Sequence, residues 1–135
     1  MTNPQQIRTK WYDRAAPISN KREHGMAYED RAALYLVEKG YRLIARNITF
    51  KSGEIDLIFE EDDERKTTLV FVEVRKRGIA SYIRAEETIT YTKERRIRSA
   101  IQQYLLKYRG KAKNIRIDLI AFQEDEIRHF PHFIG

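Results

Sequence analysis

Two short runs of β-branched and aromatic residues in this chain each carry an acidic residue near the middle. Asp56 lies within Gly53–Ile58, and Glu73 lies within Val70–Arg75. Runs of this kind are typical of buried β-strands. An ionised carboxylate in such a place is costly unless a cation or strong hydrogen-bond donors satisfy it. The chain must therefore fold so that both acids find such partners.

The spacing of the two acids predicts a metal site. Side chains at i and i+2 of a strand share a face about 6.5–7 Å apart, so Glu73 and Arg75 point the same way. If the two strands pair as a hairpin, Asp56 and Glu73 lie side by side, and two such carboxylates ionise together only with a cation between them. Oxygen ligands suit Mg²⁺ or Mn²⁺, so we predict that Asp56 and Glu73 hold one of these ions. The alternative is that both acids are structural partners of neighbouring arginines.

Length and composition narrow the class of protein. The chain has 135 residues, of which 41% are hydrophobic and 34% charged, as expected for one globular domain. There is no apolar run long enough to cross a membrane, no secretory signal pattern and no cysteine. These features favour a cytoplasmic protein without membrane contact. The net charge of +6 favours a polyanionic partner such as nucleic acid.

The first segment differs from the rest of the chain. Residues 1–20 lack periodicity and mix basic residues with Trp11 and Tyr12. They are predicted to be a flexible basic N-terminal arm, in which the aromatic residues either stack on nucleic-acid bases or pack the arm onto the domain. Residues 21–135 are predicted to form a single nuclease-like domain.

The remaining pattern predicts an α/β protein with a mixed sheet and the order α-β-β-β-α-β-β. The expected helices span 21–39 and 90–109, and the expected strands span 41–50, 54–60, 67–75, 115–122 and 127–133. Glu29 falls on the helix face that should meet the core. The acidic run at 60–64 is interpreted as a solvated hairpin loop. His129 and His132 are expected on opposite faces of the last strand, so a metal shared between them is not predicted.

Several of these residues carry a family resemblance. The chain resembles the YraN-like family of uncharacterised bacterial proteins over roughly residues 22–133. The matching segments are Gly25…Glu29-x-x-Ala32-x-x-Tyr35-Leu36-x-x-x-Gly40-Tyr41, Leu43-Ile44-Ala45-Arg46-Asn47, Gly53-Glu54-Ile55-Asp56-Leu57-Ile58, Phe71-Val72-Glu73-Val74, Lys93, Ala100…Tyr104-Leu105 and Ile117-Asp118.

The resemblance implies a restriction-endonuclease-like, or Holliday-junction-resolvase-like, core: a central mixed sheet flanked by two helices. It also implies that Glu29, Asp56 and Glu73 are the acidic site residues and that Arg75 occupies the position of the family's lysine. Arginine can hold a phosphate, but its pKa above about 12 prevents it from acting as a base. Lys93, near the start of the second helix, is therefore predicted to supply the missing lysine. The expected catalytic set is Glu29, Asp56, Glu73, Arg75 and Lys93.

Basic residues gather around this predicted site. Cations at the first turns of a helix oppose its dipole, so helix stability does not explain those on the second helix. A groove that follows a phosphate backbone does explain them, and a solvated polar face is the alternative. The predicted nucleic-acid contacts are Lys76, Arg77, Arg84, Lys93, Arg95, Arg96 and Arg98.

The function predicted from the sequence is Mg²⁺-dependent hydrolysis of phosphodiesters in DNA, with branched or flapped DNA among the candidate substrates. A non-catalytic nucleic-acid-binding module with a degenerate nuclease site is the first alternative. A protein-interaction domain whose basic face meets an acidic partner is the second. Cleavage of a junction would require two sites and hence a homodimer, although no segment is recognisable as an interface.

Overall fold

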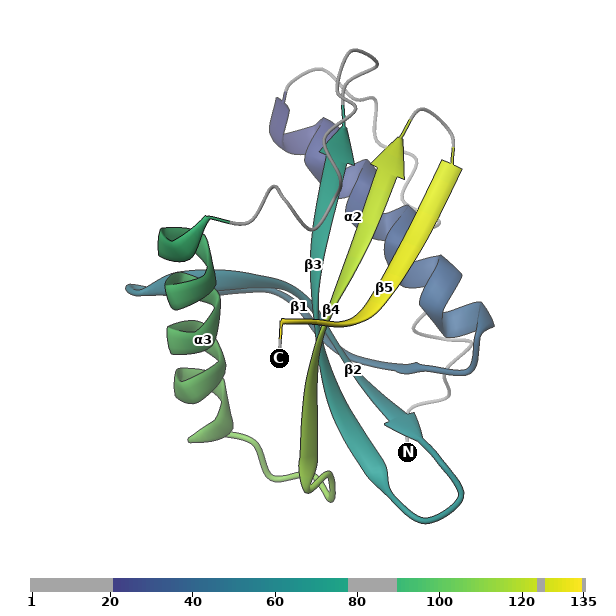
Figure 1. Cartoon of the computed structure of the whole chain (residues 1–135), viewed down its shortest axis with the longest axis vertical. Helices are drawn as coiled ribbons and strands as arrows, with labels where there is room; N and C mark the ends of the chain where they lie inside the picture. The colour runs from purple at the N-terminus through teal and green to yellow at the C-terminus, as the bar shows by residue number, and fades with distance from the viewer. Residues whose placement is uncertain (1–20, 78–89, 124–125, 135) are drawn as a thin grey trace.

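The computed structural model describes residues 21–77, 90–123 and 126–134 (Figure 1). The predicted arm, Arg84 and the side chain of Arg77 lie outside the described residues. The described elements, in chain order, are α2 (Lys21–Glu38), β1 (Arg42–Phe50), β2 (Gly53–Asp62), β3 (Thr67–Arg77), α3 (Tyr91–Leu105), β4 (Asn114–Gln123) and β5 (Glu126–Ile134). This order confirms the α-β-β-β-α-β-β prediction.

The strands form one mixed five-stranded sheet in the order β1-β2-β3-β4-β5. The pairs β1–β2, β2–β3 and β4–β5 are antiparallel, whereas β3 and β4 are parallel. A parallel pair needs a crossover connection, and α3 lies in the segment between β3 and β4. The predicted class, a mixed sheet flanked by two helices and compatible with a nuclease-like core, is confirmed in the described residues.

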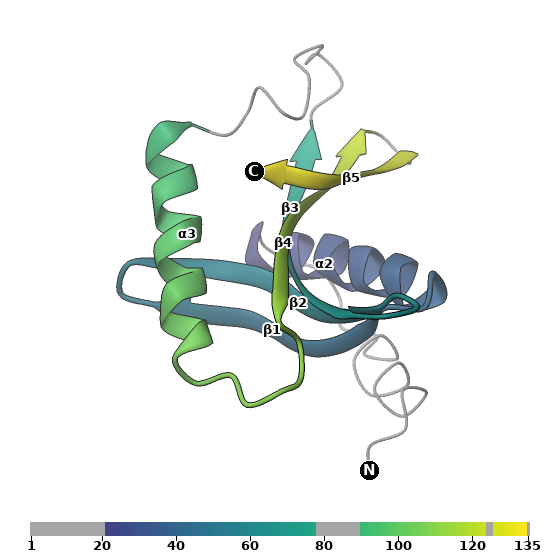
Figure 2. The same ribbon diagram turned by 60° about the horizontal axis from the view of Figure 1, so that its bottom comes forward.

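The two helices cover opposite faces of the sheet (Figure 2). Alternation along β3 sends Val70 and Val72 into the apolar cluster under α2, and Leu69 and Phe71 into the cluster under α3. The α2 side is packed by small residues of the helix, Ala32 and Ala33 among them, which let helix and sheet approach closely. The central strands are buried on both faces, so any polar group on them must be satisfied inside the protein.

Local signals fix the ends of both helices. After α2, Gly40 has φ of +100°, its N–H bonds to the Val37 carbonyl, and the Tyr41 N–H bonds back to the Leu36 carbonyl. This is a Schellman motif, which glycine permits because it has no Cβ. At the start of α3, the Thr90 side chain accepts a 3.1 Å hydrogen bond from the Lys93 N–H. That cap fixes the first turn of α3.

Two predicted boundaries were wrong. The acidic run is not simply a solvated loop, because β2 continues to Asp62 and Glu60 is 8% exposed. Glu60 accepts hydrogen bonds from Arg42 and Tyr108, which satisfy its charge beside the core. Helix α3 ends at Leu105, several residues before the predicted Arg109. No helix in the described part of the chain is long and apolar enough to cross a membrane.

Candidate active site

The pairing of β2 with β3 brings Asp56 and Glu73 together. The register pairs Leu57 with Val72, so Asp56 and Glu73 stand one step further along the same antiparallel ladder. The Val74 N–H donates a 2.8 Å hydrogen bond to Asp56 Oδ2. The two acids therefore lie side by side, as the sequence predicted, and alternation from Ile58 and Phe71 puts both on the face of the sheet that α3 covers.

The surroundings of Asp56 oppose its ionisation. Burial raises the pKa of Asp56 well above its usual value, and the charge of Glu73 raises it further. The hydrogen bond from Val74 acts in the opposite direction, while the charge of Glu29 and a hydrogen bond with Glu73 add to the increase. Without a cation between the two acids, burial and the charge of Glu73 both disfavour ionisation of Asp56.

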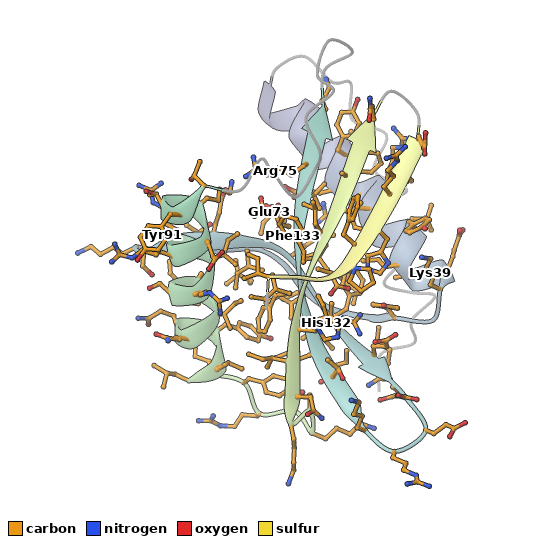
Figure 3. The ribbon with its side chains drawn as sticks, viewed as in Figure 1. Lys39, Glu73, Arg75, Tyr91, His132 and Phe133 are labelled. Atoms are coloured by element: carbon orange, nitrogen blue, oxygen red, sulfur yellow. The ribbon has the colours of Figure 1, made fainter. Side chains whose placement is uncertain are left out.

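Two cations approach Glu73, whose side chain is 9% exposed. Lys93 Nζ, from the first turn of α3, lies 3.4 Å from Glu73 Oε1. Arg75 Nε, two residues along β3, lies 3.8 Å from the same oxygen, and Figure 3 shows both residues on that strand. Arg75 Nε is buried without a hydrogen-bond partner. The structure thus brings together the four predicted site residues of β2, β3 and α3.

Glu29 approaches the site from α2. Burial raises its pKa, although Arg46 and a hydrogen bond with Asn47 act to lower it. Its Oε1 atom is buried without a hydrogen-bond partner. Glu29 is close enough for its charge to raise the pKa of Asp56, yet the described residues contain no cluster of three acidic or histidine side chains able to hold a metal.

The donor set nevertheless fits Mg²⁺ or Mn²⁺. Mg²⁺ keeps several waters and is commonly held by one or two carboxylates together with substrate phosphates. Asp56 and Glu73 provide those carboxylates, and their mutual repulsion is what a divalent cation would relieve. The unpaired Oε1 of Glu29 offers a further acceptor for a metal-bound water.

The side chains predicted to contact nucleic acid do not all point to one face of the protein. Lys76 points to the α2 side, with its Nζ 5.1 Å from the centre of the Tyr28 ring, as alternation requires. On α3, Arg95 lies over the ring of Tyr91, and Arg98 pairs with Glu94. Arg96 is directed toward the β1–β2 hairpin, where it lines a cavity with Lys93.

That cavity was not predicted from the sequence. It has a volume of about 350 Å³ and lies between the β1–β2 hairpin, residues 49–54, and the first turns of α3, where Lys93, Arg96 and Ile97 line it. Glu73 also lines it, so the cavity reaches one of the two carboxylates. The Lys51-Ser52-Gly53 turn was recognised in the sequence, but no local pattern shows that it meets a helix forty residues away.

A second polar cluster was also missed. Asp118 on β4 is fully buried and accepts hydrogen bonds from Arg116 Nε at 2.8 Å and Nη2 at 2.9 Å. His129 Nε2 lies 2.8 Å from its Oδ2, and the His132 N–H donates to Oδ1 from a backbone with φ of 54°. The isolated acid within the β4 run was the available signal. This cluster ties the edge strand β5 to the sheet.

Comparison with known proteins places the chain in a family. The uncharacterised protein family UPF0102 matches residues 28–122, which include Glu29, Asp56, Glu73 and Lys93. The chain belongs to this family. The matched region runs from the middle of α2 to the end of β4, and so it contains part of α2 and the whole of α3, the two helices that flank the site.

Individual UPF0102 proteins match over most of their length. One from Persephonella marina is 41% identical over 108 residues, which is 80% of this chain and 90% of that protein. One from Haemophilus influenzae is 38% identical over 121 residues, 87% of this chain and 98% of that protein. One from Cupriavidus metallidurans is 42% identical over 107 residues, 79% of this chain and 77% of that protein. Their names identify the family and state no activity.

Proposed function

We propose that this UPF0102 chain is a divalent-metal-dependent nuclease that hydrolyses phosphodiesters in DNA. The observation that carries the proposal is the carboxylate pair. Asp56 and Glu73 lie on adjacent strands, in a place where burial and mutual repulsion raise the pKa of Asp56 well above its usual value. A fold that places two acids so close without a cation carries a cost, and a bound Mg²⁺ or Mn²⁺ removes it.

Each residue then has a distinct part. Asp56 and Glu73 hold the metal, which when bound lowers the pKa of a coordinated water and stabilises negative charge on a phosphodiester. Arg75 donates to the scissile phosphate through a guanidinium whose Nε has no hydrogen-bond partner. Lys93, beside Glu73, orients the attacking water or takes its proton. Glu29 assists by accepting a hydrogen bond from a water in the same site.

One observation favours the alternative of a non-catalytic nucleic-acid-binding module. Lys93 and Arg75 both approach Glu73, and Asp56 shares a hydrogen bond with it, so Glu73 has partners without any metal. In that case the four residues form a structural network, and the cations of α3 bind phosphates without cleaving. Mn²⁺ affinity separates the two functions, since a structural network does not bind the ion through Asp56 and Glu73.

The test is cleavage of a labelled panel of single-stranded, duplex, flapped and four-way-junction DNA in Mg²⁺ and in Mn²⁺. The parent protein, Asp56→Ala and Asp63→Ala are purified in parallel, and Asp63 serves as the matched control because it lies exposed on the β2–β3 hairpin. We expect cleavage by the parent and by Asp63→Ala that is lost in Asp56→Ala. Binding of DNA without cleavage of any substrate would contradict the nuclease and support the binding module.

A further inference from the structure

The cavity between the β1–β2 hairpin and α3 has the size and lining of a site for one nucleoside unit. Its volume of about 350 Å³ falls at the small end of the range for small-molecule sites, about 300–1,000 Å³. A lone phosphate would leave most of this space empty. A stacked and paired nucleotide cannot enter it, because its base faces are covered by its neighbours in the duplex.

The lining offers a different group for each part of a nucleotide. Lys51, Lys93 and Arg96 provide positive charge for a phosphate. They outnumber the carboxylates of Glu54 and Glu73 in the same lining. The half-buried Phe50 provides apolar surface for the flat face of a base or for a sugar, whereas Ile97 is 5% exposed and only backs the lining. Ser52 contributes a hydroxyl whose oxygen is buried and has no hydrogen-bond partner. A buried hydroxyl of this kind is costly until a ligand supplies its partner.

The cavity has a fixed wall. A Cβ built on Gly53 would lie 2.5 Å from the carbonyl oxygen of Arg96, so the turn of the hairpin rests directly on the backbone of α3. Both views of the ribbon show the hairpin reaching α3 (Figures 1 and 2). A preformed pocket costs less ordering on binding than a flexible one.

We propose that this cavity receives one unstacked nucleotide of the substrate strand, next to the phosphodiester that Arg75 engages beside Glu73. This inference rests on the proposed nuclease function and specifies its substrate class. DNA with an unpaired nucleotide beside the cleaved bond, such as a flap or a single strand, is preferred over continuous duplex. Arg96, Ser52 and Phe50 are the residues that set this preference.

The test uses DNA flaps with 2-aminopurine at successive positions beside the junction, because the fluorescence of this base rises when it leaves the stack. Binding is measured in Ca²⁺ with the full-length chain, for the parent, Arg96→Ala, Ser52→Ala and the control Arg65→Ala. Arg65 is exposed on the β2–β3 hairpin, away from the cavity, and its replacement removes the same charge. A perfectly paired duplex with the same label is titrated alongside.

We expect the parent to bind the flap about tenfold or more tightly than duplex and to increase the fluorescence at one position only. Arg96→Ala and Ser52→Ala should reduce that preference by about fivefold, with duplex binding much less affected, and Arg65→Ala should leave it unchanged. Equal affinity for flap and duplex, or equal losses in all three variants, would overturn the inference. So would the absence of DNA binding.

Cleavage in Mn²⁺ distinguishes this inference from the proposed function. Cleavage that shows no preference for unpaired nucleotides would support the nuclease function and contradict the nucleotide pocket. Selective unstacking of the labelled base without cleavage would retain the pocket and exclude the nuclease.

Discussion

Lys93 Nζ lies 3.4 Å from Glu73 Oε1, across the boundary between α3 and β3. The contact is set by the start of the helix, where the Thr90 side chain accepts a hydrogen bond from the Lys93 N–H. In sequence the two residues are far apart, and Arg75 stands where a lysine is expected. The fold therefore supplies a lysine to the carboxylate pair from a different element.

The roles of the two cations can be separated by substitution. Lys93→Ala should lower the rate of metal-dependent cleavage by about 100-fold or more if Lys93 moves a proton, and Lys93→Arg should not restore it, because arginine keeps its proton. Arg75→Lys should retain most activity, since either side chain can neutralise a phosphate. Single-turnover cleavage with excess protein measures these effects apart from binding.

One result would contradict the roles assigned to Lys93 and Arg75. If Lys93→Ala cleaves at the parent rate while Arg75→Ala is inactive, Lys93 has no part in the chemistry. Glu94→Ala serves as the control, because its side chain pairs with Arg98 on the same helix and does not face Glu73.

Much of the fold could be predicted from the sequence, for physical reasons that are local. The alternation around Glu73 and the apolar runs of β2 and β3 indicated strands, and Gly40 indicated the end of α2. The same alternation placed Glu73 and Arg75 on one face, and the expected hairpin placed Asp56 beside Glu73. Their juxtaposition followed because antiparallel neighbours in a hairpin have a register that the turn largely determines.

The remainder depends on tertiary contacts that no local pattern specifies. Glu60 was placed where the second strand gives way to a solvated acidic loop, yet Arg42 and Tyr108 come from distant parts of the chain to satisfy it. His129 was considered only with His132, on the opposite face of the same strand, whereas its partner, Asp118, lies on another strand. The cavity next to Glu73 arises where a hairpin meets a helix, and its size depends on packing.

The raised pKa of Asp56 predicts a stability that falls as pH rises. Because the folded protein holds the Asp56 proton more tightly than the unfolded chain, whose usual pKa is 3.8, folding takes up a proton between 3.8 and the raised pKa. The stability that the Asp56 proton contributes is thus fully present below pH 3.8 and is lost as pH rises through the raised pKa. Asp56→Asn, which cannot ionise, should be more stable than the parent at pH 7 in EDTA.

Urea unfolding between pH 4 and pH 8 measures this difference, which should shrink toward pH 4. Mg²⁺ should stabilise the parent and leave Asp56→Asn unchanged, because only the parent retains both carboxylates. Asp63→Asn, on the exposed hairpin, should follow the parent throughout. If the free energy of unfolding varied with pH in the same way for the parent and Asp56→Asn, ionisation of the buried Asp56 would not destabilise the fold.

The contact between Gly53 and α3 predicts a destabilising substitution. Gly53→Ala would place a Cβ 2.5 Å from the Arg96 carbonyl oxygen, so the hairpin or the helix must shift. We expect a loss of about 1–3 kcal/mol in the free energy of unfolding. Since the clash involves backbone, Arg96→Ala should not relieve it, and the effects of the two substitutions should add. A Gly53→Ala protein as stable as the parent would show that the hairpin and α3 can shift apart at little cost in free energy.

The cluster around Asp118 predicts a pH dependence of the opposite sign. Burial raises the pKa of Asp118, but the hydrogen bonds with His129 and Arg116 outweigh it and leave the pKa below its usual 3.8. The contribution of ionised Asp118 to the free energy of unfolding is therefore present above pH 3.8 and is lost as pH falls through the lowered pKa. Asp118→Ala should cost about 3–5 kcal/mol at neutral pH, because it leaves Arg116 partly buried without its bidentate partner.

Chemical unfolding of the parent, Asp118→Ala and His129→Gln from pH 3 to pH 8 measures this contribution. His129 Nδ1 lies 3.4 Å from Lys39 Nζ and its Nε2 lies 2.8 Å from Asp118 Oδ2, so the ring bridges the two side chains. Replacement of the ring should therefore cost less than loss of the carboxylate, since Arg116 remains bound to Asp118. A larger loss for His129→Gln than for Asp118→Ala would mean that the ring, through its packing against Tyr35 and Tyr41, anchors β5 more than the charge does.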